Sequence, residues 1–557
     1  MKTICGTILA AVVLGGPRSV AVADALERLP PVAGEPLMLM RLRAPHTADD
    51  AQWAKTFKAL ADNRGACDEV WFSTGVGFPE MDWHREHVER LSRYAAELRG
   101  VGIVPSLQFQ ATIGHGDDAT EMERFEGKTW SGFTGSGGVE SKRCNCPRQG
   151  AFLDYMRDTA RLYASFRPAW VWLDDDLRIN NHSPGSTGKD IGCWCPTCLA
   201  AFNAETDGKW TRETLAAAIA EDATLYDAWE RFSFAGIAEV ARTIAEAVHG
   251  VSPETRLGLQ HCWWRNDSQL AVFNAMHEAT GLPVGSRPGG GMYYDQDPNQ
   301  QPMKAVLEAL QMKMLGAPEW IGCWCPEVET WPRAFASRTI QGILVESLTS
   351  LAYGMNSLSF LIVDTRSETD EWYAKNLLAP LAAERGVLEG YRDWNRDTVP
   401  AGISDGSGAS ADKLYNYALT GVPVVPGVGK SYGVIPADAL TIDISSQTSK
   451  NLCDLRRQAD ERAGGRLPVI VRDPSVGLVV PRLTKDGRLK SVMMLNARID
   501  VQKPVTLQLR GVASEAKEAT WQAFRNPPVT LPLRREDGET LVTLPEISAW
   551  NAGWLAL

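Results

Sequence analysis

Short apolar runs alternate with amphipathic helical stretches over most of this 557-residue chain, and this alternation restricts the fold more than any other feature. Eight runs have the length and the residue content of β-strands: residues 37–42, 69–73, 103–110, 170–176, 257–261, 282–286, 320–325 and 358–364. Helical periodicity lies between them, at residues 50–63, 83–98, 152–166, 225–248, 303–315 and 338–353. The pattern predicts an α/β fold, a (β/α)8 TIM barrel over residues 36–396. A doubly wound sheet would alternate similarly, but no glycine-rich phosphate loop follows the first run.

The rest of the chain divides into an N-terminal segment and two C-terminal regions. Lys2, an apolar stretch at residues 8–15 and small residues at 21–25 predict a signal peptide over residues 1–25, with export to the periplasm or the exterior. Residues 397–466 predict an intermediate α/β or linker region, and short alternating runs at 467–557 predict a C-terminal β-sandwich. The net charge of −11 argues against nucleic acid as a partner, and no segment predicts membrane insertion.

Cysteines cluster in two short motifs. Cys144-Asn-Cys146-Pro is followed by Cys193-Trp-Cys195-Pro-Thr-Cys198. The number and spacing of these thiols predict a structural Zn²⁺ site with four cysteine ligands, since C-x-C chelates a metal well but forms a strained disulfide. Four thiolates fill the coordination sphere, so a catalytic role for this zinc is not expected. Free or disulfide-bonded thiols are the alternative.

Charged and amide side chains follow the predicted strands, where a barrel places its active site. Asp174, Asp175 and Asp176 end the fourth strand, and Glu327 and Glu329 follow the seventh. The other candidate substrate-binding residues at strand ends are Gln108, Arg178, Asn181, His182, Gln260, Trp263, Arg287, Tyr294 and Trp331. Acidic, amide and aromatic groups together are typical of a sugar pocket, and two carboxylates on opposite sides of a sugar can break a glycosidic bond.

Several of these segments resemble one known family. The Cys-Pro at 146–147, the Leu-Asp-Asp-Asp at 173–176 and the Cys-Trp-Cys-Pro-Thr-Cys at 193–198 are similar to motifs of the family-42 β-galactosidases of glycoside hydrolase clan A. Pro-Glu-Val-Glu-Thr-Trp at 326–331 resembles the segment that carries the nucleophile of that family. The resemblance extends over most of residues 36–396 and implies a (β/α)8 barrel.

The resemblance also assigns roles to residues. Asp176 takes the place of the acid/base glutamate, Asp175 that of the preceding asparagine, and Glu327, or less closely Glu329, that of the nucleophile. The Cys-Pro match selects Cys146 rather than Cys144 as the fourth zinc ligand. In this chain an aspartate replaces the family's glutamate, which shortens the acid by one methylene.

These observations predict an exported retaining β-glycosidase that hydrolyses a β-galactoside or a similar hexoside. Retention requires the two carboxyl groups to lie about 5–5.5 Å apart. One alternative is a non-catalytic carbohydrate-binding barrel that lacks the family's Asn-Glu pair. Another is a metal-dependent hydrolase that uses the aspartate cluster and His182. The expected partner is a glycoside or oligosaccharide, and the family resemblance implies a possible homo-oligomer.

Overall fold

A parallel sheet that closes on itself forms the centre of the computed structural model. The structure describes residues 36–75, 77–115, 128–179, 191–261, 266–295, 297–316, 318–330, 337–363, 370–404, 411–425 and 449–557. The sheet follows the order β10-β11-β1-β2-β3-β6-β7-β8-β9, and all neighbouring strands are parallel. The strands are β1 (Met38–Arg41), β2 (Glu69–Ser73), β3 (Val104–Phe109), β6 (Trp170–Leu173), β7 (Arg256–His261), β8 (Val284–Pro288), β9 (Ile321–Trp324), β10 (Glu327–Glu329) and β11 (Leu358–Leu361).

The two ends of this order are consecutive pieces of one chain. β9 and β10 are separated only by Cys325 and Pro326, so together they fill one strand position. The sheet therefore closes into an eight-stranded barrel. Proline has no N–H to donate, which is consistent with the break in the ladder at this point. The predicted TIM barrel is therefore confirmed.

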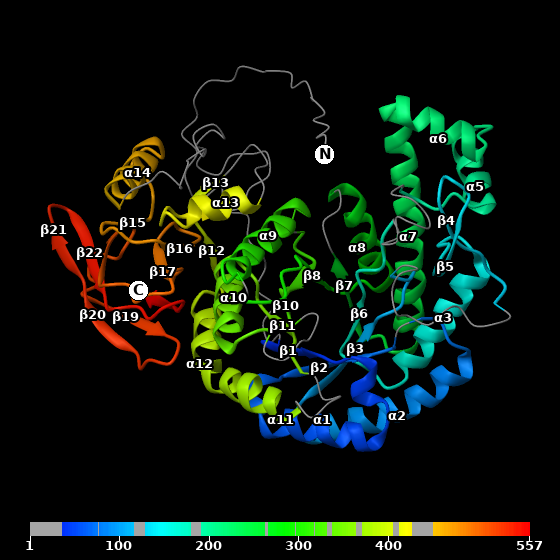
Figure 1. The fold of residues 1–557 in the computed structure, drawn as a ribbon, viewed down its shortest axis with the longest axis horizontal. Coiled ribbons are helices and arrows are strands. Elements are labelled where there is room, and N and C mark those ends of the chain that lie inside the picture. The colour runs from blue at the N-terminus through cyan, green and yellow to red at the C-terminus, as the bar shows by residue number, and fades with distance from the viewer. Residues whose placement is uncertain are drawn as a thin grey trace.

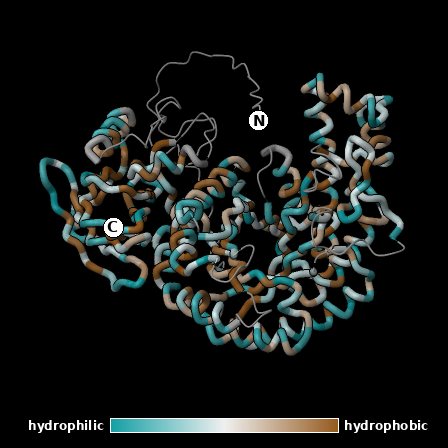
Figure 2. Tube along the Cα trace, in the orientation of Figure 1, coloured by the Kyte–Doolittle hydropathy of each residue, from teal (hydrophilic) through white to brown (hydrophobic). Residues whose placement is uncertain are grey.

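Helices surround the barrel in the order expected for the fold (Figure 1). They are α1 (Asp50–Asp62), α2 (Met81–Gly100), α3 (Gly150–Ala164), α7 (Ala223–Val251), α8 (Asn266–Thr280), α9 (Gln300–Met314), α10 (Ile340–Ala352) and α12 (Ala379–Trp394). Figure 2 shows polar residues on the outer sides of these helices and apolar residues toward the sheet. No described helix is long and apolar enough to cross a membrane.

Tryptophan side chains fill one part of the barrel interior. Trp71 stacks on Trp172 with ring centroids 4.4 Å apart, and Trp170 stacks on the other side at 5.2 Å. All three rings are buried, together with Leu39, Cys323 and Cys325. A Cβ at Gly258 or Gly285 would lie within 2.4 Å of the Trp172 ring, so these strand positions require glycine. We call this aromatic layer the tryptophan floor.

Two insertions extend from neighbouring barrel loops. The loop after β3 carries the hairpin β4 (Gly132–Thr134) and β5 (Glu140–Asn145), and the loop after β6 carries α5 (Pro196–Thr206) and α6 (Arg212–Glu221). Figure 1 shows these elements side by side with the long helix α7 at one end of the molecule. The two predicted cysteine motifs lie in these insertions.

The C-terminal part forms two antiparallel sheets that share one apolar core, as expected of a β-rich domain. One sheet has the order β12-β16-β17-β23-β19-β20 and the other β15-β18-β22-β21. The strands are β12 (Thr398–Pro400), β15 (Val469–Val471), β16 (Gly477–Thr484), β17 (Leu489–Asn496), β18 (Val505–Leu509), β19 (Glu518–Ala523), β20 (Val529–Pro532), β21 (Arg534–Glu536), β22 (Glu539–Leu544) and β23 (Ala552–Ala556).

The described part of the region between the barrel and these sheets has few helices and strands. It contains β13 (Ile403–Ser404), α13 (Ala411–Ala418), β14 (Val424–Val425) and α14 (Ser449–Arg462). β12 also comes from the segment expected to be intermediate, but it pairs with β16 and so extends the C-terminal sheet. Arg482 of β16 donates to the carbonyl oxygens of Ala352, at 2.9 Å, and Thr398, at 2.6 Å, and thereby joins this sheet to α10.

Candidate active site

Polar side chains from five strand positions form a continuous hydrogen-bonded arc inside the barrel. Asp174, which follows β6, accepts from Gln108 of β3 at 2.7 Å and from Gln260 of β7 at 3.0 Å. Gln260 accepts from Arg287 of β8 at 2.9 Å, and Arg287 donates to Glu327 of β10 at 2.5 Å. All five side chains are buried. The structure therefore brings together residues that the sequence placed on five separate strands and their loops.

Arg41 of β1 extends this arc on the side of Glu329. Its guanidinium lies 3.1 Å from the Glu329 carboxylate and 3.5 Å from Gln108. The sequence does not single out Arg41 as a site residue, because it lies within an apolar run that is typical of a buried strand. A buried charge at the carboxyl end of a barrel strand is the signal that could have identified it.

Glu327 is held in the ionised form. Its second carboxylate oxygen accepts from the Tyr293 hydroxyl at 3.1 Å and from the backbone N–H of Gly290 at 3.3 Å. Burial alone would raise the pKa of Glu327, but the positive charges of Arg287 and Lys304 outweigh burial and hold the pKa below its usual value. An ionised, oriented carboxylate is suited to nucleophilic attack.

Glu329 behaves in the opposite way. Burial raises the pKa of Glu329, Arg41 opposes this effect, and the negative charge of Glu327 adds to it. Both side chains point to the same face of the short strand, since they are two residues apart. The surrounding charges and burial thus move the pKa values of the two carboxyl groups in opposite directions, and Glu327 is the one stabilised as an anion.

The three consecutive aspartates have three different environments. Asp176 is fully buried and accepts from the backbone N–H groups of Thr112, at 3.1 Å, and Gly114, at 2.7 Å, as well as from the Thr112 hydroxyl. Asp176 therefore fixes the loop after β3. This arrangement argues against the acid/base role that the family resemblance implied, because an acid catalyst must reach the substrate.

Asp175 is the member of the triplet that is open to solvent, with a side chain 20% exposed. Burial raises the pKa of Tyr293 and the charge of Asp175 adds to this effect, whereas at Glu327 that charge only partly opposes the cations that lower the pKa. Burial lowers the pKa of His261 to about 3, which Asp175 opposes only in part. The Asp175 carboxylate also lies 3.9 Å from Nε2 of His115. Asp174, by contrast, is held within the polar arc.

His115 is a further residue at this site that the sequence did not indicate. Its Nε2 atom lies 3.0 Å from Asp174 and 3.9 Å from Asp175. One ligand atom from each of these three residues lies within 4.8 Å of the others, so the group could hold a cation. His115 was missed because it comes after the third strand has ended, in a loop with no recognisable motif.

The remaining predicted site residues differ in burial, and four of them lie outside the described residues. Arg178 is buried, with one N–H 3.4 Å from the His115 carbonyl oxygen, and Tyr294 is 37% exposed. Asn181, His182, Trp263 and Trp331 lie outside the described residues, as do residues 1–25.

The four predicted metal-ligating cysteines converge. Cys146 Sγ lies 3.5 Å from the sulfur atoms of both Cys195 and Cys198, and all four sulfur atoms, including that of Cys193, lie within 4.8 Å of one another. A disulfide would require about 2.05 Å, whereas sulfur atoms at the corners of a tetrahedral zinc site lie about 3.8 Å apart. Cys144 is not part of this cluster, since its thiol donates to the Gly114 carbonyl oxygen at 3.1 Å.

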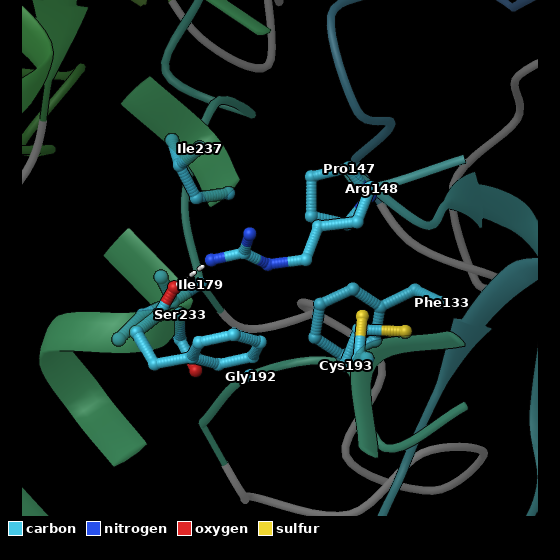
Figure 3. A pocket seen from close by; sticks show the side chains of 10 residues that line it. Phe133, Pro147, Arg148, Ile179, Gly192, Cys193, Ser233 and Ile237 are labelled. Carbon is cyan, nitrogen blue, oxygen red and sulfur yellow. Dashed lines mark hydrogen bonds between the residues drawn. The ribbon is translucent and has the colours of Figure 1, made fainter. Parts of the chain in front are cut away.

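The cysteine cluster joins the two barrel insertions. The backbone N–H of Thr134 in β4 donates to Cys193 Sγ at 3.4 Å. Figure 3 shows the small pocket beside the cluster, into which the side chain of Arg148 extends. The guanidinium of Arg148 lies 3.8 Å from the centroid of the Phe232 ring and donates to the Phe232 carbonyl oxygen at 2.6 Å. The loops after β3 and β6, which carry His115 and the aspartates, are thus connected to each other.

Known structures with the same fold cover nearly the whole chain. A GH42 β-galactosidase from G. stearothermophilus, solved as a catalytic mutant, has a TM-score of 0.58 and 9% identity, over 95% of this chain and 99% of that one. The cold-adapted β-galactosidase from Rahnella sp. R3 has a TM-score of 0.54 and 12% identity, over 94% and 100%. The β-galactosidase from Bacillus circulans sp. alkalophilus has a TM-score of 0.53 and 9% identity, over 93% and 100%.

Sequence comparisons alone do not reveal this relationship, because no protein-family model and no curated protein sequence matches the chain. The resemblance indicated by the short motifs is confirmed at the level of the fold. This chain therefore has the fold of the family-42 β-galactosidases, carried by a sequence that has diverged far from theirs.

Proposed function

We propose that this protein is a retaining β-glycosidase that acts on a β-galactoside or a similar hexoside. The observation that carries the proposal is the polar arc that joins Glu327, which Arg287 and Lys304 keep ionised and Tyr293 orients, to Asp174, the chain neighbour of the partly exposed Asp175. Two carboxyl groups in different environments, one anionic and one accessible, are the requirement of a double-displacement mechanism.

In the first step Glu327 would attack the anomeric carbon while Asp175 donates a proton to the leaving glycosidic oxygen. This step breaks the glycosidic bond and forms an ester between the sugar and Glu327. In the second step Asp175 would take a proton from water, which then displaces Glu327 from the anomeric carbon. Gln108, Asp174 and Gln260 would hold the reacting groups in place through the polar arc.

The test is a hydrolysis screen on nitrophenyl glycosides. The wild-type protein should release nitrophenol from a β-linked hexoside, and an activated 2-fluoro sugar should label Glu327 covalently, as peptide mass spectrometry would show. Activity should not require an added divalent cation, and it should persist in a chelator as long as the protein stays folded, because the zinc proposed below is structural. Activity that depends on added cation would instead favour a metal-dependent hydrolase built on His115, Asp174 and Asp175. Binding of sugars without turnover or labelling would leave a carbohydrate-binding barrel.

We also propose that the four-cysteine cluster binds one structural Zn²⁺. Its thiols are buried and mutually close, and four thiolates leave no position for a catalytic water. The predicted signal segment supports export, and the zinc would then stabilise an exported protein.

Zinc binding makes a prediction about one substitution. Cys195→Ser should abolish most of the zinc content, which should be about one ion per wild-type chain, and should lower the melting temperature. Metal analysis and thermal unfolding measure both quantities. The matched control is Cys144→Ser, since Cys144 is equally buried, lies two residues from Cys146 and stays outside the cluster. Equal zinc loss in both variants would contradict the assignment.

A further inference from the structure

The barrel wall has a seam on one side of β10. Within the described residues β10 pairs with β11 alone, whereas β8 pairs with β9 as far as Trp324, after which the Cys325 N–H donates to the Ser286 carbonyl oxygen at 3.1 Å. The Thr330 N–H donates to the Leu361 carbonyl oxygen at 3.1 Å. The backbone N–H and C=O groups of residues 328 and 330 therefore face β11. The backbone groups of Glu327 and Glu329 therefore face the seam.

Side chains from α9 and from the segment just before α10 satisfy the backbone groups at this seam. Lys304 Nζ donates to the Glu327 carbonyl oxygen, and Glu308 accepts from the Glu327 N–H at 3.0 Å. Arg338, which precedes α10, donates to the Glu329 carbonyl oxygen at 3.0 Å. These three side chains occupy the place of the peptide groups that a paired strand would supply.

The charges at the seam are paired with one another. Glu346 of α10 lies 3.3 Å from Lys304 and 2.6 Å from Arg338, and Arg338 also donates to Asp295 at 2.9 Å. The side chains of Lys304, Glu346 and Arg338 have 0% exposure. Buried charges are costly unless they are paired and hydrogen-bonded, so this arrangement requires that all partners are present.

The backbone at the seam leaves room for these side chains. A Cβ at Gly290 would lie 2.8 Å from Cγ of Lys304, and a Cβ at Gly342 would lie 2.6 Å from a carboxylate oxygen of Asp295. Both positions therefore exclude larger residues without a shift of the charged groups. The seam is a close-packed part of the structure.

We infer that Lys304, Glu308 and Arg338 are positioning residues that fix the backbone of β10 and thereby aim the Glu327 carboxylate. This inference rests on the proposed function and adds residues that sit outside the barrel. Lys304 also acts through its charge, since its Nζ lies 3.8 Å from the Glu327 carboxylate and contributes to the lowered pKa of that group. Removal of this charge should raise the pKa of Glu327.

The experiment compares Lys304→Met with Arg456→Met in the full-length protein. Arg456 is a matched control because it is also a buried cation that donates to backbone carbonyl oxygens, but it lies in α14, away from the barrel. Its acceptors are the carbonyl oxygens of Thr420, Val471, Asp473 and Ser475. Lys304→Met should lower kcat by about 100-fold. It should also move the acidic limb of the kcat/KM profile to higher pH by about one unit, because Glu327 must then lose its proton without the nearby cation. Arg456→Met should lower only the melting temperature.

Glu308 provides a second test in case Lys304→Met does not fold. Burial raises the pKa of Glu308 to about 8, so at neutral pH it is mainly uncharged and glutamine is a close mimic. Glu308→Leu removes the acceptor of the Glu327 N–H and should lower kcat, whereas Glu308→Gln should restore most of that loss.

Two results would overturn the inference. The first is a Lys304→Met protein with wild-type kcat and an unmoved acidic limb, and the second is an equal kcat for Glu308→Leu and Glu308→Gln at wild-type level. Failure of the proposed function has a different signature, since the wild-type protein itself would then neither hydrolyse any glycoside nor be labelled at Glu327. That outcome removes the reaction that the seam is inferred to support.

Discussion

Replacement of Glu327 by glutamine should reduce kcat by about 10⁴-fold or more, because the variant loses the group that bonds to the anomeric carbon. Glutamine has nearly the same shape, and its amide oxygen can accept from Tyr293 and Gly290, although its NH2 group then replaces the acceptor of Arg287. Initial rates on the best nitrophenyl glycoside measure the effect, and thermal unfolding checks the fold. Azide, which can attack in place of the missing carboxylate, should restore part of the rate of Glu327→Ala.

Glu329→Gln is the matched control for this experiment. Glu329 is buried on the same strand and pairs with Arg41, but it is not stabilised as an anion. The substitution should lower kcat far less than Glu327→Gln and should leave the fluoro-sugar label on Glu327. A larger loss in Glu329→Gln, or a label on Glu329, would reverse the assignment of the nucleophile.

The second large effect is expected at the aspartate triplet. Asp175→Asn should lower kcat/KM by about 10²- to 10⁴-fold on glycosides with poor leaving groups, which need a proton. Nitrophenyl and dinitrophenyl glycosides depend less on that proton, so the loss should shrink as the leaving group improves. The alkaline limb of the pH–rate profile should disappear in the same variant, since it reports ionisation of the acid.

Asp176→Asn tests whether the family-based assignment or the structure is right about the acid. Asp176 accepts three hydrogen bonds from Thr112 and Gly114 and has no exposed surface, so the variant should unfold at lower temperature and keep the leaving-group dependence of the wild type. The opposite result, a leaving-group-dependent loss in Asp176→Asn and not in Asp175→Asn, would place the acid at residue 176.

The barrel could be predicted from the sequence because buried parallel strands and amphipathic helices leave different periodicities. Gln108, Asp174, Gln260, Arg287 and Glu327 were also predictable, since each lies at the end of a predicted strand or directly after it. These predictions depend only on order along the chain and on the rule that a barrel gathers its strand ends at one face.

The distinction among the three aspartates could not be predicted in this way. It depends on Thr112 and Gly114, which belong to the loop after another strand and are brought to Asp176 only by folding. The seam was hidden for a similar reason. Lys304 and Glu308 are four residues apart on an amphipathic helix, where charges usually face water, and nothing local shows that this face turns toward β10.

The tryptophan floor limits how a substrate can enter the site and how its products can leave. Trp71, Trp170 and Trp172 are buried and stacked on one another inside the barrel, so we expect a ligand to enter, and its products to leave, at the carboxyl ends of the strands. Hydrocarbon below the carboxylates also replaces water there, and charge–charge forces in that direction are less weakened than they would be in solvent. Access from one side and a low dielectric constant below the carboxylates therefore both follow from these three rings.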